Sequence, residues 1–150
     1  MKSFVFSLDR MRNYKLQLLD KEKNILGRLR KAKEEIEQKI IFLKKYLKQI
    51  REEIKVKQEQ GITAVEMNAF HFLLENTNRQ IEELYLALEK AEKEVEHQLK
   101  IVVQASQEVS ALDKLEEKQL EEYHILENKE NELKILEYVT TDLVREQARS

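Results

Sequence analysis

Two Glu-x-x-His pairs are the residues of this 150-residue chain whose types and spacing come closest to metal chemistry: Glu94 with His97, and Glu121 with His124. Carboxylate-bridged di-iron bundles place two such pairs on facing helices, with further glutamates from two other helices. Here both pairs fall in one predicted helix, separated by 27 residues or roughly 40 Å. One chain cannot bring both to one metal pair, and only a domain-swapped dimer of four helices would. We therefore expect no metal site.

Other catalytic arrangements are missing from the sequence. Cysteine is absent, so there is no thiolate nucleophile and no thiolate metal site. Gly27 and Gly61 are isolated, so no glycine-rich loop can cradle a phosphate. No Ser-His-Asp arrangement is evident, and a two-helix rod offers no concave pocket that excludes water. The sequence predicts no enzymatic activity, no catalytic residue and no cofactor.

The composition is that of a long helix or coiled coil. Charged residues make up 37% of the chain, hydrophobic residues make up 41%, and proline, cysteine and tryptophan are absent. A net charge of −2 gives no general attraction to nucleic acid. The longest strongly apolar runs are about four residues, whereas a membrane span needs ~20. We expect a cytoplasmic protein that is not inserted in the membrane and reaches its inner face only through partners.

The strongest signals for a helix end and a helix start lie at residues 61–67. Gly61 can take the left-handed conformation that ends a helix. Thr63 and Glu66 have the spacing of a capping box at the start of the next helix, and Ile62 and Met67 have that of a hydrophobic staple. A loop this short forces the two helices to run antiparallel.

The predicted fold is all-α: one coiled-coil domain over residues 1–150, built as a long antiparallel two-helix hairpin with an extended C-terminal helix. Helix one covers about 7–60, with Ser7 as its N-cap, the turn about 61–63, and helix two about 64–145. Apolar residues recur in steps of three and four, which is the heptad signature. The first seam consists of Leu18, Ile25, Leu29, Ala32, Ile36, Ile40, Leu43, Leu47, Ile50 and Ile54. The second consists of Ile81, Leu84, Leu88, Ala91, Val95, Leu99, Val102, Val109 and Leu112.

A turn near Gly61 predicts that facing residues have numbers summing to about 122. Val95 then faces Gly27. A close approach of the two helices would explain a glycine at this position, and a chance surface position would explain it equally well. Roughly 115–150 has no partner within the hairpin. This tail keeps an apolar seam, so it either binds a partner or frays. Its seam residues are Leu120, Tyr123, Leu126, Leu133 and Leu136, followed by Val139, Leu143 and Val144.

Charge is distributed unevenly between the two helices. Residues 28–48 carry eight Lys/Arg and three Glu, and residues 108–137 carry ten Asp/Glu and four Lys. These tracts either fix the orientation of the antiparallel pair or are two solvated faces.

The start of helix two is richer in apolar residues than one seam requires. Phe70, Leu73, Thr77 and Leu84 lie along one side at helical spacing, and Phe72 falls outside that stripe. These residues either fill the tip of the hairpin or form an aromatic patch that binds a partner.

The chain resembles the FliJ family, the small coiled-coil component of the bacterial flagellar type III export apparatus. The resemblance covers nearly the whole chain and is strongest from Gly61 to Phe70. Further matches are Phe4-x-Phe6-x-Leu8, Leu112-x-x-Leu115-x-x-Lys118 and Tyr123 followed by Glu127-x-x-Glu130. The chain departs from the family at Leu136-Glu137-Tyr138-Val139, where many members have Asp-Glu-Leu/Phe-Ala.

The resemblance implies a stalk similar to the gamma subunit of rotary ATPases. Its terminal coiled-coil end would enter the hexameric ring of the export ATPase, through the tail seam residues. The implied contact with the cytoplasmic domain of the export gate membrane protein falls on Leu73, Thr77, Gln80 and Leu84, beside Phe70. Escort of export chaperones is also implied.

Two alternatives remain besides this non-enzymatic export stalk. One is the equivalent stalk of a virulence injectisome, and the other is a structural coiled coil that associates with itself. A stalk is expected to be a monomeric rod, whereas a self-associating coiled coil is expected to be a stable dimer or larger.

Overall fold

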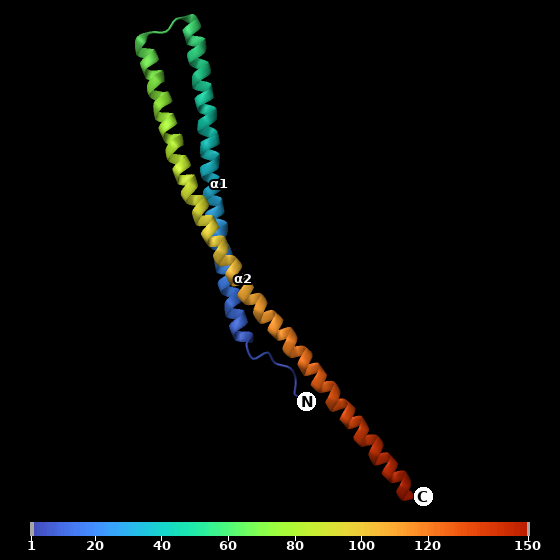
Figure 1. Cartoon of the computed structure of the whole chain (residues 1–150). Coiled ribbons are helices and arrows are strands. Elements are labelled where there is room, and N and C mark those ends of the chain that lie inside the picture. Colours follow the sequence, from blue (N-terminus) through green and yellow to red (C-terminus); the bar gives the residue numbers. More distant parts are fainter. Residues whose placement is uncertain (1, 150) are drawn as a thin grey trace. The chain divides into compact units, whose positions relative to one another are not determined.

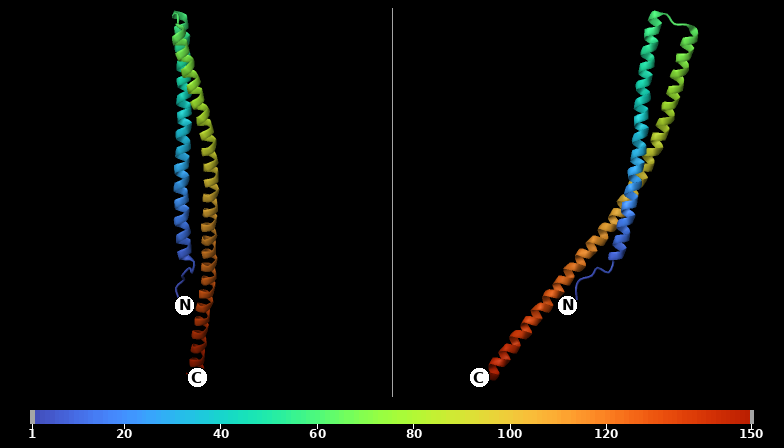
Figure 2. Two further views of the ribbon diagram at one scale, coloured as in Figure 1. Left: turned by 90° about the vertical axis from the view of Figure 1, so that its left-hand side faces the viewer. Right: turned by 180° about the vertical axis from the view of Figure 1, so that it is seen from behind.

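The computed structural model describes residues 2–149, and it consists of two α-helices (Figure 1). Helix α1 spans Asp9–Gln60 and helix α2 spans Ala64–Arg149. Figure 2 shows from two further sides that they are joined by one short connection and run in opposite directions. No strand occurs in the described residues. The predicted all-α helical hairpin is therefore confirmed.

The connection between the helices has the geometry that its residues predict. Gly61 has a φ of 97°, in the region that glycine adopts at helix ends without a Cβ penalty. The backbone N–H of Glu66 donates to the Thr63 hydroxyl oxygen at 3.2 Å, which is one half of the capping box. Ile62 and Met67 are both half-buried, as a hydrophobic staple requires. Helix α1 thus stops and helix α2 starts within three residues.

The helix ends elsewhere differ slightly from the sequence prediction. Helix α1 begins at Asp9, because the chain turns at Ser7 and Leu8 and the Asp9 N–H donates to the Phe6 carbonyl at 3.2 Å. Asp9 lies in the first turn, where a negative charge favours the helix dipole. Helix α2 continues to Arg149, a few residues beyond the predicted end. Its last turn ends in a basic residue, which the dipole also favours.

The chain divides into two compact units. The turn unit comprises Asp20–Val103, and the terminal unit comprises the residues up to Leu19 and those from Gln104. The buried apolar residues of the turn unit are Leu26, Ile40, Leu47, Ile50, Ile81 and Val102. Those of the terminal unit are Phe6, Leu19 and Val109. Each such side chain stabilises its unit by about 1.5–3 kcal/mol when fully buried.

The predicted seams are largely recovered, with the following corrections. Ala32 and Leu99 are exposed rather than packed, and Leu19 and Leu26 are buried more deeply than their predicted neighbours Leu18 and Ile25. Around residue 99 the interface instead contains Gln98, which is buried. With Gln98 in place of Leu99, the core-facing positions Ala91, Val95, Gln98 and Val102 follow steps of four, three and four.

Gln98 is tolerated in the interface because Glu22 satisfies its amide. The Gln98 Nε2 donates to the Glu22 main-chain carbonyl at 3.1 Å and also to the Glu22 carboxylate. A buried polar side chain that meets its partner in only one alignment fixes the register of a helix pair. The residue numbers of this pair sum close to the predicted 122, and those of Lys15 and Glu108 do so as well.

Gly27 does not mark a close approach of the helices, so that explanation was wrong. It is exposed, and a Cβ placed there would meet nothing within 4 Å. Gly27 is therefore a surface glycine within a helix, where it costs stability relative to alanine.

Candidate partner-binding surfaces

The histidine and carboxylate side chains are spread along the helices of the described part of the chain. No group of three or more His, Asp or Glu side chains that could hold a metal ion occurs there. His97 is exposed, on the outward face that the sequence predicts. Neither helix contains a stretch long and apolar enough to span a bilayer, again within residues 2–149. The remaining candidates are surfaces that could contact another protein.

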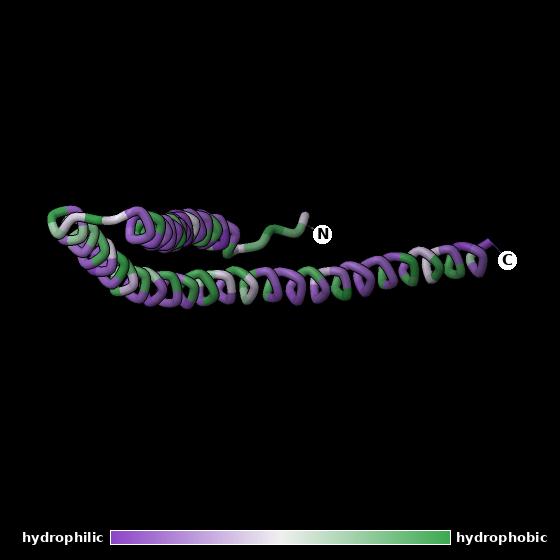
Figure 3. Tube along the Cα trace, turned by 90° about the horizontal axis from the view of Figure 1, so that it is seen from above, coloured by the Kyte–Doolittle hydropathy of each residue, from purple (hydrophilic) through white to green (hydrophobic). Residues whose placement is uncertain are grey.

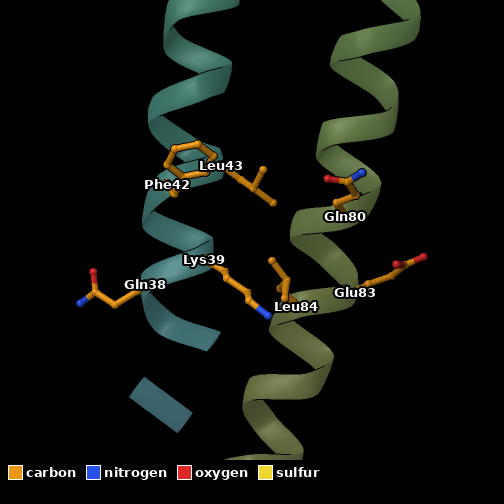
Figure 4. Close-up of a pocket in the computed structure, with 7 residues that line it drawn as sticks. All are labelled: Gln38, Lys39, Phe42, Leu43, Gln80, Glu83 and Leu84. Carbon is orange, nitrogen blue, oxygen red and sulfur yellow. The ribbon is translucent and has the colours of Figure 1, made fainter. Parts of the chain in front are cut away.

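The turn unit contains a groove of about 540 Å³ between α1 and α2 (Figure 4). Leu43 and Leu84 project into the space between the helices, and Lys39 extends from α1 toward Leu84. Phe42 borders the groove with 68% of its surface exposed. The rim is polar, formed by Gln38, Gln80 and Glu83. An apolar floor with a polar rim is the usual anatomy of a protein-binding surface.

The five residues predicted to face the export gate do not all lie on one exposed surface. Gln80 and Leu84 line the groove, with Gln80 exposed and Leu84 half-buried. Leu73 is exposed but does not line the groove. Thr77 is only 4% exposed, so it packs in the helix interface and cannot offer a binding surface. Phe70 is half-buried, with the Lys57 ammonium 5.4 Å from its ring centroid.

Helix α1 contributes groove residues that the sequence analysis did not single out. Lys39, Phe42 and Leu43 line the groove opposite Gln80 and Leu84. Leu43 belongs to the predicted seam, and Phe42 lies beside it in the apolar run Ile40-Ile41-Phe42-Leu43. The signal was that run itself, because one seam cannot bury four consecutive residues of a helix.

The terminal unit is held by ion pairs between the start of α1 and the acidic part of α2. The Lys15 ammonium lies 2.9 Å from the Glu108 carboxylate, and Arg12 pairs with both Asp113 and Glu116. These pairs join the first turns of α1 to the acidic part of α2 within the terminal unit. Hydrogen bonds from Lys15 and then Gln104, followed by the charge of Lys15, lower the pKa of Glu108.

Residues 2–8, which we call the strap, are not helical and contact α2. The Phe4 ring lies 5.6 Å from the Tyr123 ring between centroids, tilted by 54°. The Tyr123 hydroxyl donates to the Lys2 carbonyl at 2.7 Å. Phe6 is only 6% exposed, with the Arg12 guanidinium 5.4 Å from its ring centroid. Burial, and then a hydrogen bond with Glu127 and the charges of Glu127 and Glu130, raise the pKa of Tyr123.

The strap contacts the first part of the segment, roughly 115–150, that was expected to have no partner within the hairpin; residue 150 lies outside the described residues. Leu120 and Tyr123, two of the predicted ring-facing residues, are half-buried, and Tyr123 is covered by the strap. Leu126, Leu133 and Leu136 are exposed. A non-helical strap has no helical periodicity, so only the Phe4-x-Phe6-x-Leu8 alternation signalled it.

The helix beyond Tyr123 remains regular and carries many exposed apolar residues. Figure 3 shows apolar positions recurring along α2 as far as its C-terminal part. This part of the tail comprises residues 125–149. Its exposed apolar residues are Ile125, Leu126, Leu133, Ile135, Leu136, Tyr138, Val139, Leu143 and Val144. Such an isolated helix is marginal in water, so this surface is suited to a protein partner.

Comparison with known proteins identifies one family. The model of the family described as "Flagellar FliJ protein" matches residues 4–147, which include the strap from Phe4, both helices and nearly all of the tail. Neither the search of curated proteins nor the search of solved structures found a match.

Proposed function

Because the chain belongs to the FliJ family of flagellar export-apparatus components, we propose that it is a non-enzymatic stalk of flagellar protein export. Its partners are the hexameric export ATPase and the cytoplasmic domain of the export gate membrane protein. Export chaperones are a third class of partner, and the stalk escorts them for reuse. The stalk is monomeric and works at the inner face of the cell membrane through these partners.

The observation that carries this proposal is the exposed apolar surface of the tail. Leu126, Leu133 and Leu136 stay in a helix without packing against any described residue that would bury them. A surface of this kind gains stability only when a partner covers it. An ATPase ring with an apolar central opening provides such cover for a single inserted helix.

The groove of the turn unit supports a second contact, with the export gate. Its apolar floor is formed by Leu43 and Leu84 and is bordered by Phe42, a large exposed aromatic residue. Aromatic residues that enter a partner's pocket carry much of the binding free energy at protein interfaces. The gate surface thus consists of Gln80 and Leu84 from α2 together with Lys39, Phe42 and Leu43 from α1.

Co-sedimentation of the purified chain tests this function. We expect the wild-type chain to bind the export ATPase and, separately, the gate's cytoplasmic domain, and to sediment as a monomer when alone. Binding to neither partner would contradict the proposal. A dimer whose mass does not change with concentration would favour a self-associating coiled coil instead.

A further inference from the structure

The strap covers a part of α2 that the tail site needs. We propose that residues 2–8 regulate the ATPase-facing tail, by occupying the Tyr123 face in the free protein and leaving it when the export ATPase binds. This inference rests on the proposed function of the tail and adds a regulatory element to it.

The strap is positioned by contacts from alternate residues. Phe4 stacks against Tyr123, and Phe6 is buried beside Arg12, whereas Val5 between them is 80% exposed. This alternation is typical of an extended segment, in which successive side chains point to opposite sides. Phe4 and Phe6 therefore hold the strap in place, and Val5 provides a matched position that faces solvent.

The contacts that hold the strap are few. Among the described residues, the hydrogen bond from Tyr123 to Lys2 is the one hydrogen bond that joins the strap to α2. The Phe4–Tyr123 ring contact and the burial of Phe6 beside Arg12 are further attachments. Segments with so few contacts open at low free-energy cost while the rest of the fold stays intact. The end of the strap that carries Phe4 can therefore leave Tyr123 without unfolding α1 or α2.

The strap and a partner of the tail compete for neighbouring positions. Tyr123 and Leu126 are three residues apart on α2, so their side chains are neighbours on the helix surface. Leu126 and Leu133 are separated by two helical turns on the same side. A partner seated on Leu133 and Leu126 meets Tyr123 next, and there it encounters Phe4.

The size of the effect follows from the fraction of chains with the strap docked. If the binding-competent form is one tenth of the population, the apparent affinity of the ATPase is tenfold weaker than its intrinsic affinity. Loosening the strap then tightens binding by about tenfold, which corresponds to ~1.4 kcal/mol.

The test compares the affinity of the purified export ATPase for three full-length chains: wild type, Phe4→Ser and Val5→Ser. We expect Phe4→Ser to bind about tenfold more tightly and Val5→Ser to bind as the wild type does. Adding Leu133→Asp to Phe4→Ser should abolish the increase in affinity, because that increase depends on binding of the ATPase to the tail. Equal affinities of wild type and Phe4→Ser, or weaker binding by Phe4→Ser, would overturn the strap's role and leave the proposed function standing.

A second measurement follows the strap directly. The chain has no tryptophan, so Phe4→Trp introduces one tryptophan whose emission can be excited apart from that of the five tyrosines. We expect its emission to be protected from acrylamide in the free chain and accessible after the ATPase is added. Protection that persists in the complex would overturn the proposal. If none of the three chains binds the ATPase, both the proposed function and the strap's role are contradicted. Equal binding by all three chains contradicts only the strap's role, so the two outcomes can be distinguished.

Discussion

The hydroxyl of Tyr123 donates a hydrogen bond to the main-chain carbonyl of Lys2 at 2.7 Å, joining residues that lie 121 positions apart in the sequence. The same tyrosine ring packs against Phe4. One side chain of α2 therefore fixes both the backbone and a side chain of the strap. The strap in turn determines how much of α2 is open to a partner.

This hydrogen bond gives strap docking a dependence on alkaline pH. A tyrosinate cannot donate, and burial together with Glu127 and Glu130 raises the pKa of Tyr123 above its usual 10.0. Because the folded pKa is the higher one, the contribution is complete below pH 10 and is lost as pH rises through the folded pKa. We expect the Phe4→Trp reporter to lose its protection from acrylamide in that alkaline range.

The matched control for this titration is Phe4→Trp combined with Tyr123→Phe. That variant keeps the ring contact and lacks the hydroxyl, so its reporter should be less protected at neutral pH and should show no alkaline step. An identical alkaline step in both chains would place its cause elsewhere than at Tyr123.

The pair formed by Lys15 and Glu108 predicts a dependence on acid pH. Its hydrogen bonds and charge lower the pKa of Glu108 below the usual 4.5. A lowered folded pKa means that the contribution is present above pH 4.5 and disappears as pH falls through the folded value. Lys15→Met should lower the melting temperature at pH 7 and have little effect once Glu108 is protonated. The measurement is thermal unfolding by circular dichroism at several pH values, and an equal loss at all of them would contradict the assignment.

The two glycines predict substitutions of opposite sign. Gly27 is exposed within α1 with open space around it, so Gly27→Ala should stabilise the chain by about 0.5–1 kcal/mol. Gly61 also has open space, but its φ is positive, and Gly61→Ala should destabilise by about 1–2 kcal/mol. Urea unfolding of both variants measures these differences. A loss of stability in Gly27→Ala would contradict this prediction and would indicate that the helices approach closely at Gly27.

Phe42 gives the sharpest test of the groove. Phe42→Ser should weaken binding to the gate's cytoplasmic domain by about tenfold or more, as expected for loss of an aromatic anchor. It should hardly affect folding, because the side chain is mostly exposed. Leu86→Ser is the matched control, since Leu86 is 69% exposed and does not line the groove. Calorimetric titration measures both affinities, and equal losses in the two variants would argue against a specific site at the groove.

The structure also improves the choice of residues for such a test. Substituting Leu84 by a charged residue would disturb a half-buried position, and Thr77 is inside the helix interface. A loss of gate binding by either variant would therefore mix loss of contact with loss of stability. Phe42 avoids this because it lines the groove and its side chain is mostly exposed.

The hairpin was predictable from the sequence because local signals decide it. Gly61, Thr63 and Glu66 act through their own backbone neighbours, and the seam from Ile36 to Ile54 follows helical periodicity alone. The prediction failed where a long-range pairing decides which residue is buried. Gln98 lies in the interface in place of Leu99, and its amide is satisfied by Glu22 of the other helix. The apolar periodicity of one helix does not reveal such a polar pairing.

The binding surfaces were only partly predictable for the same reason. Leu126, Leu133 and Leu136 form an apolar pattern on one helix, and their exposure follows from the difference in helix lengths. The groove needs residues from both helices, so Phe42 and Lys39 emerge only once α1 and α2 are paired. The strap depends on contact between Phe4 and Tyr123, for which an extended segment carries no periodic signal.

The stalk function itself is tested most directly by the turnover rate of the purified export ATPase in the presence of the chain. We expect the wild-type chain to raise this rate, and Leu133→Asp with Leu136→Asp to abolish the increase, because both leucines are exposed on the tail and their loss leaves the fold intact. Asn131→Asp, which adds a charge at another exposed tail position, should stimulate as the wild type does. Full stimulation by the double leucine variant would contradict the account.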